Sequence, residues 1–233
     1  MSDVFMTGCS LDCIREEIPE GAFIIIGAGQ FGSRAVRLIS QGSDAPIFVV
    51  DVDMDRLSSL GSVRINRISC DGVEFLIKNY RSMNPANTVV PAVPFHLAFE
   101  WLASYLKGDF EVKKISVPEE IRPFLPNTWP GSEGSLLVSY ANFICPDDCP
   151  EPDSCTVTGE RREEPLHRLL SRLSYPGFNV HIIRSRQIAP GLGGYRITDL
   201  TNAAEWFKRD GAGKWVLGTA CKCHGILTAF EIR

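Results

Sequence analysis

The chain has 233 residues, of which 44% are hydrophobic, and a formal net charge of −4. This length suffices for one large α/β domain with a modest extension, and the acidic balance argues against a general nucleic-acid or anionic-membrane binder. No apolar run approaches the ~18 residues that a membrane helix needs, and the N-terminus lacks the pattern of a signal peptide. We therefore expect a cytoplasmic protein without membrane insertion.

Residues 1–20 are predicted to be an irregular lead-in, and residues 21–233 a single domain. The domain opens with an apolar run at 23–26 that leads directly into Gly27-Ala28-Gly29-Gln30-Phe31-Gly32. A helical pattern follows, and a second apolar run at 47–50 ends in Asp51. Strand, glycine turn, helix, strand and acid in this order are typical of a dinucleotide-binding βαβ unit.

Each residue of the glycine turn has a physical task in such a unit. Gly27 allows the tight turn out of the strand, Gly29 lets a pyrophosphate approach the backbone, and Gly32 lets the helix pack closely on the sheet. The helix N-terminus near Gln30 and Phe31 offers free N–H groups and a positive dipole end to the phosphates. These five residues are therefore predicted cofactor contacts.

Asp51 predicts the identity of the dinucleotide. A carboxylate at the end of the second strand accepts hydrogen bonds from the adenosine ribose and repels a 2′-phosphate, which favours NAD over NADP. Arg56 follows closely and could soften this preference. The alternative interpretation is a Rossmann-type domain that has lost its ligand.

The rest of the chain continues the alternation of strands and helices. Strands are predicted at 63–69 and 88–93, with helices at 73–81 and 95–106. This order indicates a Rossmann-like α/β fold, with a mainly parallel sheet and helices on both faces. Residues 107–134 are rich in proline and are predicted to be a crossover loop. Further βα units form an extension over about 135–233, with strands predicted at 136–144, 180–184, 215–219 and 226–232 and helices at 166–173 and 197–208.

A cysteine loop is the second informative feature of the sequence. Cys145, Cys149 and Cys155 lie within eleven residues, and two of them precede proline. Such a loop can wrap thiolates around one metal ion, with Cys223 as the expected fourth ligand, although Cys221 or His224 could replace it. Three or four soft ligands suit zinc or an iron–sulfur cluster. The alternatives are functional thiols without a metal, or inert structural cysteines.

The segment Cys221-Lys222-Cys223-His224-Gly225 is the third feature. If it is extended, Cys221 and Cys223 face one side and His224 faces the other. A cysteine here could be a nucleophile or a redox thiol, but the metal-ligand interpretation is favoured because the cysteine loop lacks a fourth partner.

Three weaker signals concern other cysteines, a glycine-rich turn and a histidine. Cys9 and Cys13 have helical spacing, which predicts core packing or exposure, and a reducing cytosol argues against a disulfide framework. The glycines at 190–194 form either a second anion-binding turn or a tight loop without a ligand. His96 lies on an apolar helix face, where packing is expected.

Residues 23 to about 80 resemble the NAD-binding domains of potassium-uptake regulators (the KTN or RCK type). The resemblance rests on IIIGAGQFG, on VVDVDMDRL, and on Cys70-Asp71-Gly72, where that family usually carries a Gly-Asp pair after the third strand. It implies that Gly27, Gly29, Gly32 and Asp51 contact the nucleotide and that Asp71 contacts it on the adenine side. It also implies a regulatory role on a partner protein.

The expected function follows from the residues at the carboxyl ends of the predicted strands. Ligands bind there in a parallel α/β sheet, and Cys70, Cys145, Cys221 and Cys223 all follow predicted strands. The sequence therefore predicts a redox-linked, NAD-binding oxidoreductase with a cysteine-ligated metal or cluster near the nicotinamide. The alternative is a non-catalytic NAD sensor that acts on a protein partner or as a homodimer. Motifs of serine hydrolases, P-loop NTPases and zincins are absent from the sequence.

Overall fold

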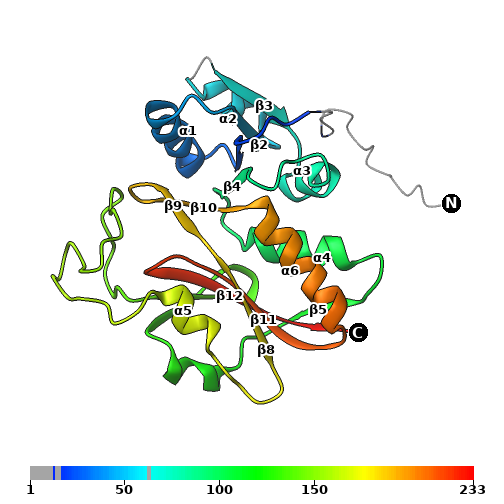
Figure 1. Ribbon diagram of the computed structural model, residues 1–233, viewed down its shortest axis with the longest axis vertical. Helices are drawn as coiled ribbons and strands as arrows, with labels where there is room; N and C mark the ends of the chain where they lie inside the picture. The colour runs from blue at the N-terminus through cyan, green and yellow to red at the C-terminus, as the bar shows by residue number, and fades with distance from the viewer. Residues whose placement is uncertain (1–12, 14–16, 62–63) are drawn as a thin grey trace.

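The computed structural model describes residue 13 and residues 17–61 and 64–233 (Figure 1). Its strands form two sheets. The first has the order β3-β2-β1-β4-β10-β9, and the second has the order β6-β7-β12-β11-β8, with β5 paired to β12. In the view of Figure 1 the first sheet lies above the second, and the C-terminal helix α6 runs alongside both.

Four parallel strands form the centre of the first sheet. They pair in register as β3 with β2, β2 with β1, and β1 with β4, which is the order of one half of a Rossmann fold. Their bounds are β1 (Phe23–Ile26), β2 (Ile47–Asp51), β3 (Ile65–Ser69) and β4 (Thr88–Pro91). The predicted Rossmann-like α/β class is thus confirmed.

Helices cover both faces of this sheet because successive buried residues point to opposite sides. Ile25 and Val49 belong to the apolar cluster with α1 (Gln30–Gly42) and α2 (Met54–Ser59). Ile24 and Val50 belong instead to the cluster with α3 (Gly72–Asn79) and α4 (Leu97–Leu106). The near-continuous apolar runs of β1 and β2 are therefore those of strands buried on both faces.

A hairpin from the C-terminal part of the chain completes the first sheet. β10 (Leu192–Arg196) pairs antiparallel with β4, and β9 (Arg186–Ala189) pairs antiparallel with β10. The glycine-rich segment at 190–194 was predicted to be a turn between a strand and a helix. It holds the turn of this hairpin and the first three residues of β10.

The remaining strands do not extend the parallel sheet as further βα units but form the second sheet. It is mainly antiparallel, and only β8 and β11 run parallel. Its members are β5 (Val112–Ile115), β6 (Asn127–Pro130), β7 (Leu136–Ser139), β8 (Asn179–Arg184), β11 (Gly213–Ala220) and β12 (His224–Ile232). The helices of this half are α5 (Leu166–Ser171) and α6 (Ile197–Asp210).

The prediction of a structureless crossover loop at 107–134 is wrong. This segment holds β5, β6 and the 3-10 helices η2 (Glu119–Phe124) and η3 (Ser132–Gly134). Proline is tolerated at the end of an edge strand because no partner there needs its N–H group. Pro130 ends β6, which is such an edge strand.

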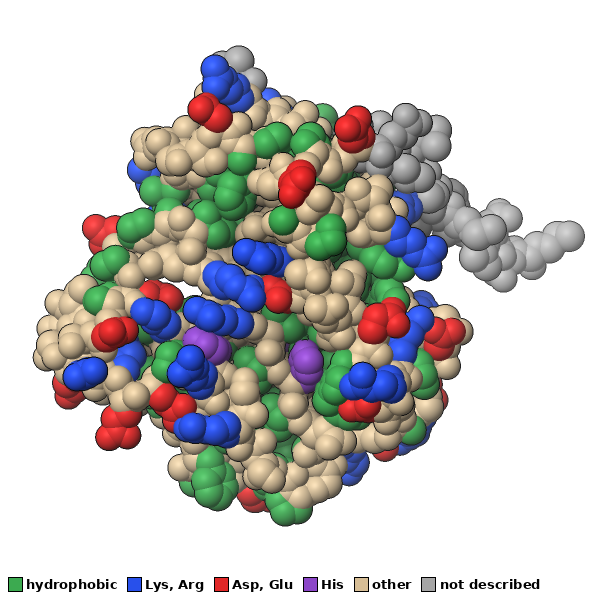
Figure 2. All heavy atoms as spheres, viewed as in Figure 1, with side chains coloured by type: hydrophobic (Ala, Val, Ile, Leu, Met, Phe, Trp, Pro, Cys, Tyr) green, Lys and Arg blue, Asp and Glu red, His purple; other side chains and the backbone are tan. Residues whose placement is uncertain are grey.

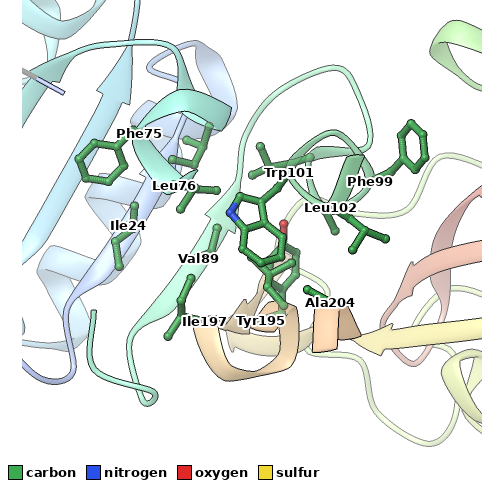
Figure 3. Close-up of a cluster of buried hydrophobic side chains, with 14 of the residues drawn as sticks. Ile24, Phe75, Leu76, Val89, Phe99, Trp101, Leu102, Tyr195, Ile197 and Ala204 are labelled. Atoms are coloured by element: carbon green, nitrogen blue, oxygen red, sulfur yellow. The ribbon is translucent and has the colours of Figure 1, made fainter. Parts of the chain in front are cut away.

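One apolar cluster connects the two sheets. Figure 3 shows side chains of β1, α3, β4, α4, β10 and α6 gathered together, with Trp101 and Tyr195 fully buried among them. The same cluster continues to Trp215 of β11 and Phe230 of β12. The two sheets therefore share one core.

A disulfide corrects the expectation for Cys13. Cys13 is bonded to Cys70, 57 residues away, and both side chains are buried. The amide of Asn79 donates a hydrogen bond of 2.6 Å to the carbonyl oxygen of Cys13, so Cys13 is held at both the start and the end of α3. Cys9 lies outside the described residues. No helix in the described part of the chain has the length and apolar content to cross a membrane.

Candidate functional site

The backbone of the glycine turn explains why glycine occupies two of its positions. Gly27 has a φ of +106°, a conformation that L side chains rarely adopt. A Cβ on Gly32 would overlap the carbonyl oxygen of Gly27, so this glycine is needed for packing. A Cβ built on Gly29 would have no heavy atom of another part of the chain within 4 Å, so the surface of the turn is open there. Gln30 and Phe31 begin α1, and Phe31 is 69% exposed.

Asp51 is held against this turn. Its Oδ2 accepts a hydrogen bond of 2.6 Å from the N–H of Ala28, and its Oδ1 accepts one of 2.9 Å from the N–H of Asp53. A carboxylate has about four acceptor sites, so both oxygens can also accept from a ribose hydroxyl. Arg56 forms an ion pair with Asp53 at 3.1 Å.

Asp71 has a structural task at the start of α3. It is the N-cap of this helix and accepts a hydrogen bond of 2.9 Å from the N–H of Glu74. The side chain is exposed at the same edge of the sheet as Asp51, directly after the disulfide-bonded Cys70. The adenine-side contact implied by the resemblance remains a prediction.

The cysteine loop is fixed by hydrogen bonds from two other parts of the chain. From α1, Arg34 donates to the carbonyl oxygen of Asp147. From the β9–β10 hairpin, the N–H of Gly191 and the side-chain amide of Gln187 donate to the carbonyl oxygen of Cys149 at 2.9 and 2.8 Å. In Figure 1 this loop lies at the left, below α1 and beside the hairpin. The hairpin whose glycine-rich segment was expected to be either an anion-binding turn or a tight loop without a ligand therefore positions the cysteine loop.

Residues 221–223 are not extended but form the turn between β11 and β12, and His224 and Gly225 begin β12. The N–H of Cys221 donates to the carbonyl oxygen of His224 at 2.9 Å, which closes the turn. The N–H groups of Cys223 and His224 point at the Cys221 sulfur, at 3.4 and 3.3 Å. The turn also brings the Cys221 sulfur to 3.9 Å from Nδ1 of His224, although the two side chains were expected on opposite sides.

Donor atoms of the loop and the turn converge. Cys145 Sγ lies 3.4 Å from His224 Nε2. Glu151, Cys223 and His224 each offer one donor atom, and these atoms lie within 4.8 Å of one another, so the group could hold a metal ion. A second described group, Cys13, Cys70 and Glu74, has both its thiols in the disulfide.

Of the four predicted ligands, Cys223 belongs to the described group that could hold a metal ion. Cys145 interacts electrostatically with Cys149 and Cys155, and Cys223 interacts with Cys149 and Cys145. The tightest group contains Cys223 but replaces two loop cysteines with Glu151 and His224. The spacing of the cysteines did not predict Glu151 or His224 as first-choice ligands, although Glu151 lies in the cysteine loop and His224 in the segment at 221–225.

The thiols around this group differ in acidity. Burial raises the pKa values of Cys221 and Cys223 to about 12. Burial also raises the pKa of Cys145, and desolvation of the imidazole ring lowers the pKa of His224, although the residue as a whole is exposed. By contrast, the N–H groups of Thr158 and Val157 lower the pKa of the Cys155 thiol. Without a cation the buried thiols therefore stay protonated, and a bound metal ion would have to release their protons.

A cavity of about 400 Å³ lies between this group and the N-terminal half of α1. It is lined by Phe31 and Arg34 of α1 and also by Cys145, Glu151 and His224. A second cavity, of about 480 Å³, lies beside Cys145, Cys155 and Cys223 and is lined by Tyr140, Arg161 and Arg162. Figure 2 shows Lys and Arg side chains gathered across the middle of this face of the molecule, next to histidine side chains.

The fold and the site define an α/β protein with a Rossmann-like sheet and a cluster of thiol, imidazole and carboxylate groups at its edge. The chain belongs to the family whose model is described as "Uncharacterized protein, C-terminal domain" and matches residues 98–233. It is similar to an "Uncharacterized protein" of Archaeoglobus fulgidus, with 28% identity over 227 residues that cover 89% of this chain and 98% of the relative. The cysteine loop and the β11–β12 turn lie within the residues that the family model matches.

Proposed function

We propose that this protein binds NAD and acts as a redox-linked oxidoreductase, with a metal ion held by thiolates at the nicotinamide end of the cofactor. The parallel strands, the open surface at Gly29 and the position of Asp51 support dinucleotide binding. The preference for NAD over NADP follows from the negative charge of Asp51. The metal is either zinc or part of an iron–sulfur cluster, because cysteine thiolates bind both.

One observation supports the two halves of this proposal together. The cavity of about 400 Å³ has Phe31 and Arg34, at the start of α1, on one side and Cys145, Cys221 and His224 on the other. The start of α1 is where the pyrophosphate of a bound dinucleotide would lie. A dinucleotide that extends from this turn into the cavity would bring its nicotinamide toward the thiols.

The chemistry would be hydride transfer to or from a carbonyl or alcohol carbon. NADH would transfer a hydride, which carries two electrons, to the carbonyl carbon and become NAD⁺, and the carbonyl oxygen would take up one proton from solvent. A metal ion at the cysteine site would polarise the carbonyl oxygen. Arg34 is well placed to hold an anionic substrate or phosphate in the cavity, because its guanidinium reaches the mouth of the cysteine loop.

The experiment is a calorimetric titration with NAD⁺, NADH and NADP⁺, followed by an assay of NADH oxidation with a panel of aldehydes and ketones. We expect NAD(H) to bind more tightly than NADP⁺ and at least one carbonyl compound to be reduced. If no dinucleotide binds, the proposal fails. If NADH binds but no member of the panel is reduced, the oxidoreductase half is rejected in favour of a sensor.

A regulatory function is the second candidate, and Arg34 favours it. Its guanidinium joins α1 to the carbonyl oxygens of Asp147 and Pro190, so a ligand at the glycine turn can act on the cysteine loop through one side chain. A sensor that reports the NAD state to a partner needs such a connection. We would measure NAD affinity with and without bound zinc in the wild type and in Arg34→Gln. In a sensor the metal changes NAD affinity, and the substitution removes that effect.

A further inference from the structure

The cysteine site offers a mixed set of donors rather than four thiolates. We infer that it takes one divalent ion of the zinc class, bound by Cys145, Glu151, Cys223 and His224, with Cys221 as a positioning residue. This inference rests on the metal half of the proposed function, and it stands or falls independently of dinucleotide binding.

The distances between the donor atoms fit such an ion. With bonds of about 2.3 Å to sulfur and about 2.0 Å to nitrogen, two donors of a tetrahedral zinc site lie roughly 3.5 Å apart. Cys145 Sγ and His224 Nε2 lie 3.4 Å apart. The donor atoms of Glu151, Cys223 and His224 lie within 4.8 Å of one another, and Cys145 joins this group through its contact with His224.

The backbone already holds these donors in place. His224 begins β12, where it pairs with Ser139, and the carbonyl oxygen of Cys223 accepts a hydrogen bond of 3.0 Å from the N–H of Tyr140. Lys222 donates to the carbonyl oxygen of Glu151 at 3.2 Å, which attaches the loop to the turn. The site is therefore formed before the ion binds, which reduces the ordering that binding requires.

Cys221 supplies an independent observation that points to a metal-bound histidine. A histidine that binds a metal through one ring nitrogen usually has its other nitrogen oriented by an outer partner. The Cys221 sulfur lies 3.9 Å from His224 Nδ1 and is itself held by two N–H groups of the turn. This arrangement directs Nε2 toward Cys145.

The chemistry of the donors selects the class of ion. Iron–sulfur clusters are held mainly by four thiolates, whereas two thiolates, one imidazole and one carboxylate suit zinc. Cys145, Glu151 and His224 also line the cavity of about 400 Å³. An ion at this position is therefore accessible to a small ligand from the side of the dinucleotide unit.

The test is a titration of the metal-free, full-length protein with cobalt(II), monitored by absorption, with competition by zinc. We expect one equivalent to bind, with thiolate-to-cobalt charge transfer and the intense visible bands of a tetrahedral site. His224→Ala and Cys145→Ser should each weaken cobalt binding by about 100-fold or more. Loss of an outer partner costs up to about 100-fold, and loss of a direct ligand should cost at least as much. Circular dichroism checks that each variant is folded, and His224 is exposed, so its substitution leaves the core intact.

Cys155→Ser is the matched control, because it removes a thiol from the same loop but not from the inferred set. It should leave cobalt binding unchanged. Cys221→Ser should weaken cobalt binding about tenfold, as expected for an outer partner, while the thiolate-to-cobalt charge transfer persists. If Cys221 were purely structural, the folded variant would bind cobalt as tightly as the wild type.

Three results would overturn the inference. The first is an equal loss of cobalt affinity in Cys155→Ser and Cys145→Ser with no effect of His224→Ala. The second is iron and sulfide in protein purified without oxygen, and the third is a folded chain that binds neither cobalt nor zinc. NAD⁺ titration of the same metal-free samples separates failure of this inference from failure of dinucleotide binding.

Discussion

The carboxylate of Asp51 accepts a hydrogen bond of 2.6 Å from the N–H of Ala28, 23 residues earlier in the chain. This bond joins the end of β2 to the centre of the glycine turn. The group expected to contact the ribose and the turn expected to contact the pyrophosphate are thus fixed relative to each other before a ligand binds. Such preorganisation favours affinity because less ordering is required on binding.

The charge of Asp51 should decide the choice of cofactor. We expect Asp51→Asn to weaken NAD⁺ binding by about tenfold, which corresponds to ~1.4 kcal/mol, and to reduce the discrimination against NADP⁺ because the 2′-phosphate no longer faces a negative charge. Calorimetric titration of both cofactors measures the change. Asp44→Asn, at a side chain that is 97% exposed, is the control. Equal affinity of the wild type for NAD⁺ and NADP⁺ would contradict the prediction.

Two glycines of the turn should separate binding from folding. A Cβ at Gly32 overlaps the Gly27 carbonyl, so Gly32→Ala should lower the free energy of unfolding by about 2–3 kcal/mol. A Cβ at Gly29 meets no protein atom, so Gly29→Ala should change stability by less than about 0.5 kcal/mol but weaken NAD⁺ binding by obstructing the pyrophosphate. Urea unfolding and NAD⁺ titration are measured on both variants, and unchanged NAD⁺ affinity in Gly29→Ala would count against the glycine-turn site.

The disulfide between Cys13 and Cys70 should contribute substantially to stability. It closes a loop of 57 residues, and loss of such a cross-link costs about 2–4 kcal/mol, mainly because the unfolded chain gains freedom. We expect the double variant Cys13→Ser/Cys70→Ser to unfold at lower urea concentration and to be insensitive to a phosphine reductant. Cys155→Ser should keep the reductant sensitivity of the wild type. An unfolding midpoint of the wild type that does not change on reduction would refute this role.

His96 should make the protein sensitive to acid. Its side chain is buried, Nδ1 lies 2.9 Å from Thr228 Oγ1, and Nε2 has no hydrogen-bond partner among the described residues. Burial, assisted by the charge of Lys114, lowers the pKa of His96 from 6.5 to about 3. The folded state therefore needs the neutral ring. The stability from this group is complete above pH 6.5 and is lost as the pH falls from 6.5 toward 3, by up to about 1.4 kcal/mol per pH unit.

The measurement for His96 is the free energy of unfolding between pH 7 and pH 4 in the wild type and in His96→Gln. Carboxylates titrate in both proteins, so the difference between the two curves isolates the histidine. We expect the variant to lose less stability per pH unit. Parallel curves would show that the ring can be protonated in the folded state.

The β1–α1–β2 unit could be predicted from the sequence because its determinants are local. The turn at Gly27, the start of α1 and the end of β2 at Asp51 follow each other in the chain, and each has a distinct residue type. The second sheet could not be predicted in the same way, because the pattern of a strand does not identify its partners. β12 pairs with β11, β7 and β5, and those pairings follow from packing of the whole core.

The segments of the candidate site and two of its members, Cys145 and Cys223, could be predicted from the sequence. The spacing of the loop cysteines did not indicate His224, because only the geometry of a hairpin turn brings its ring to them. The disulfide of Cys13 could not be inferred either, because two cysteines 57 residues apart give no local signal. Both contacts depend on segments that meet only in the folded chain.

The pairing of β10 with β4 has a consequence for how this protein can be divided. The family model begins at residue 98, within α4, yet β10 lies far beyond that point and forms the neighbour of β4 in the first sheet. A fragment that starts there would leave β10 without its partner, and the complementary fragment would expose the edge of β4. The fragments before and after residue 98 each supply one strand of the β4–β10 pair. We therefore expect them to recover the native structure only when they are mixed.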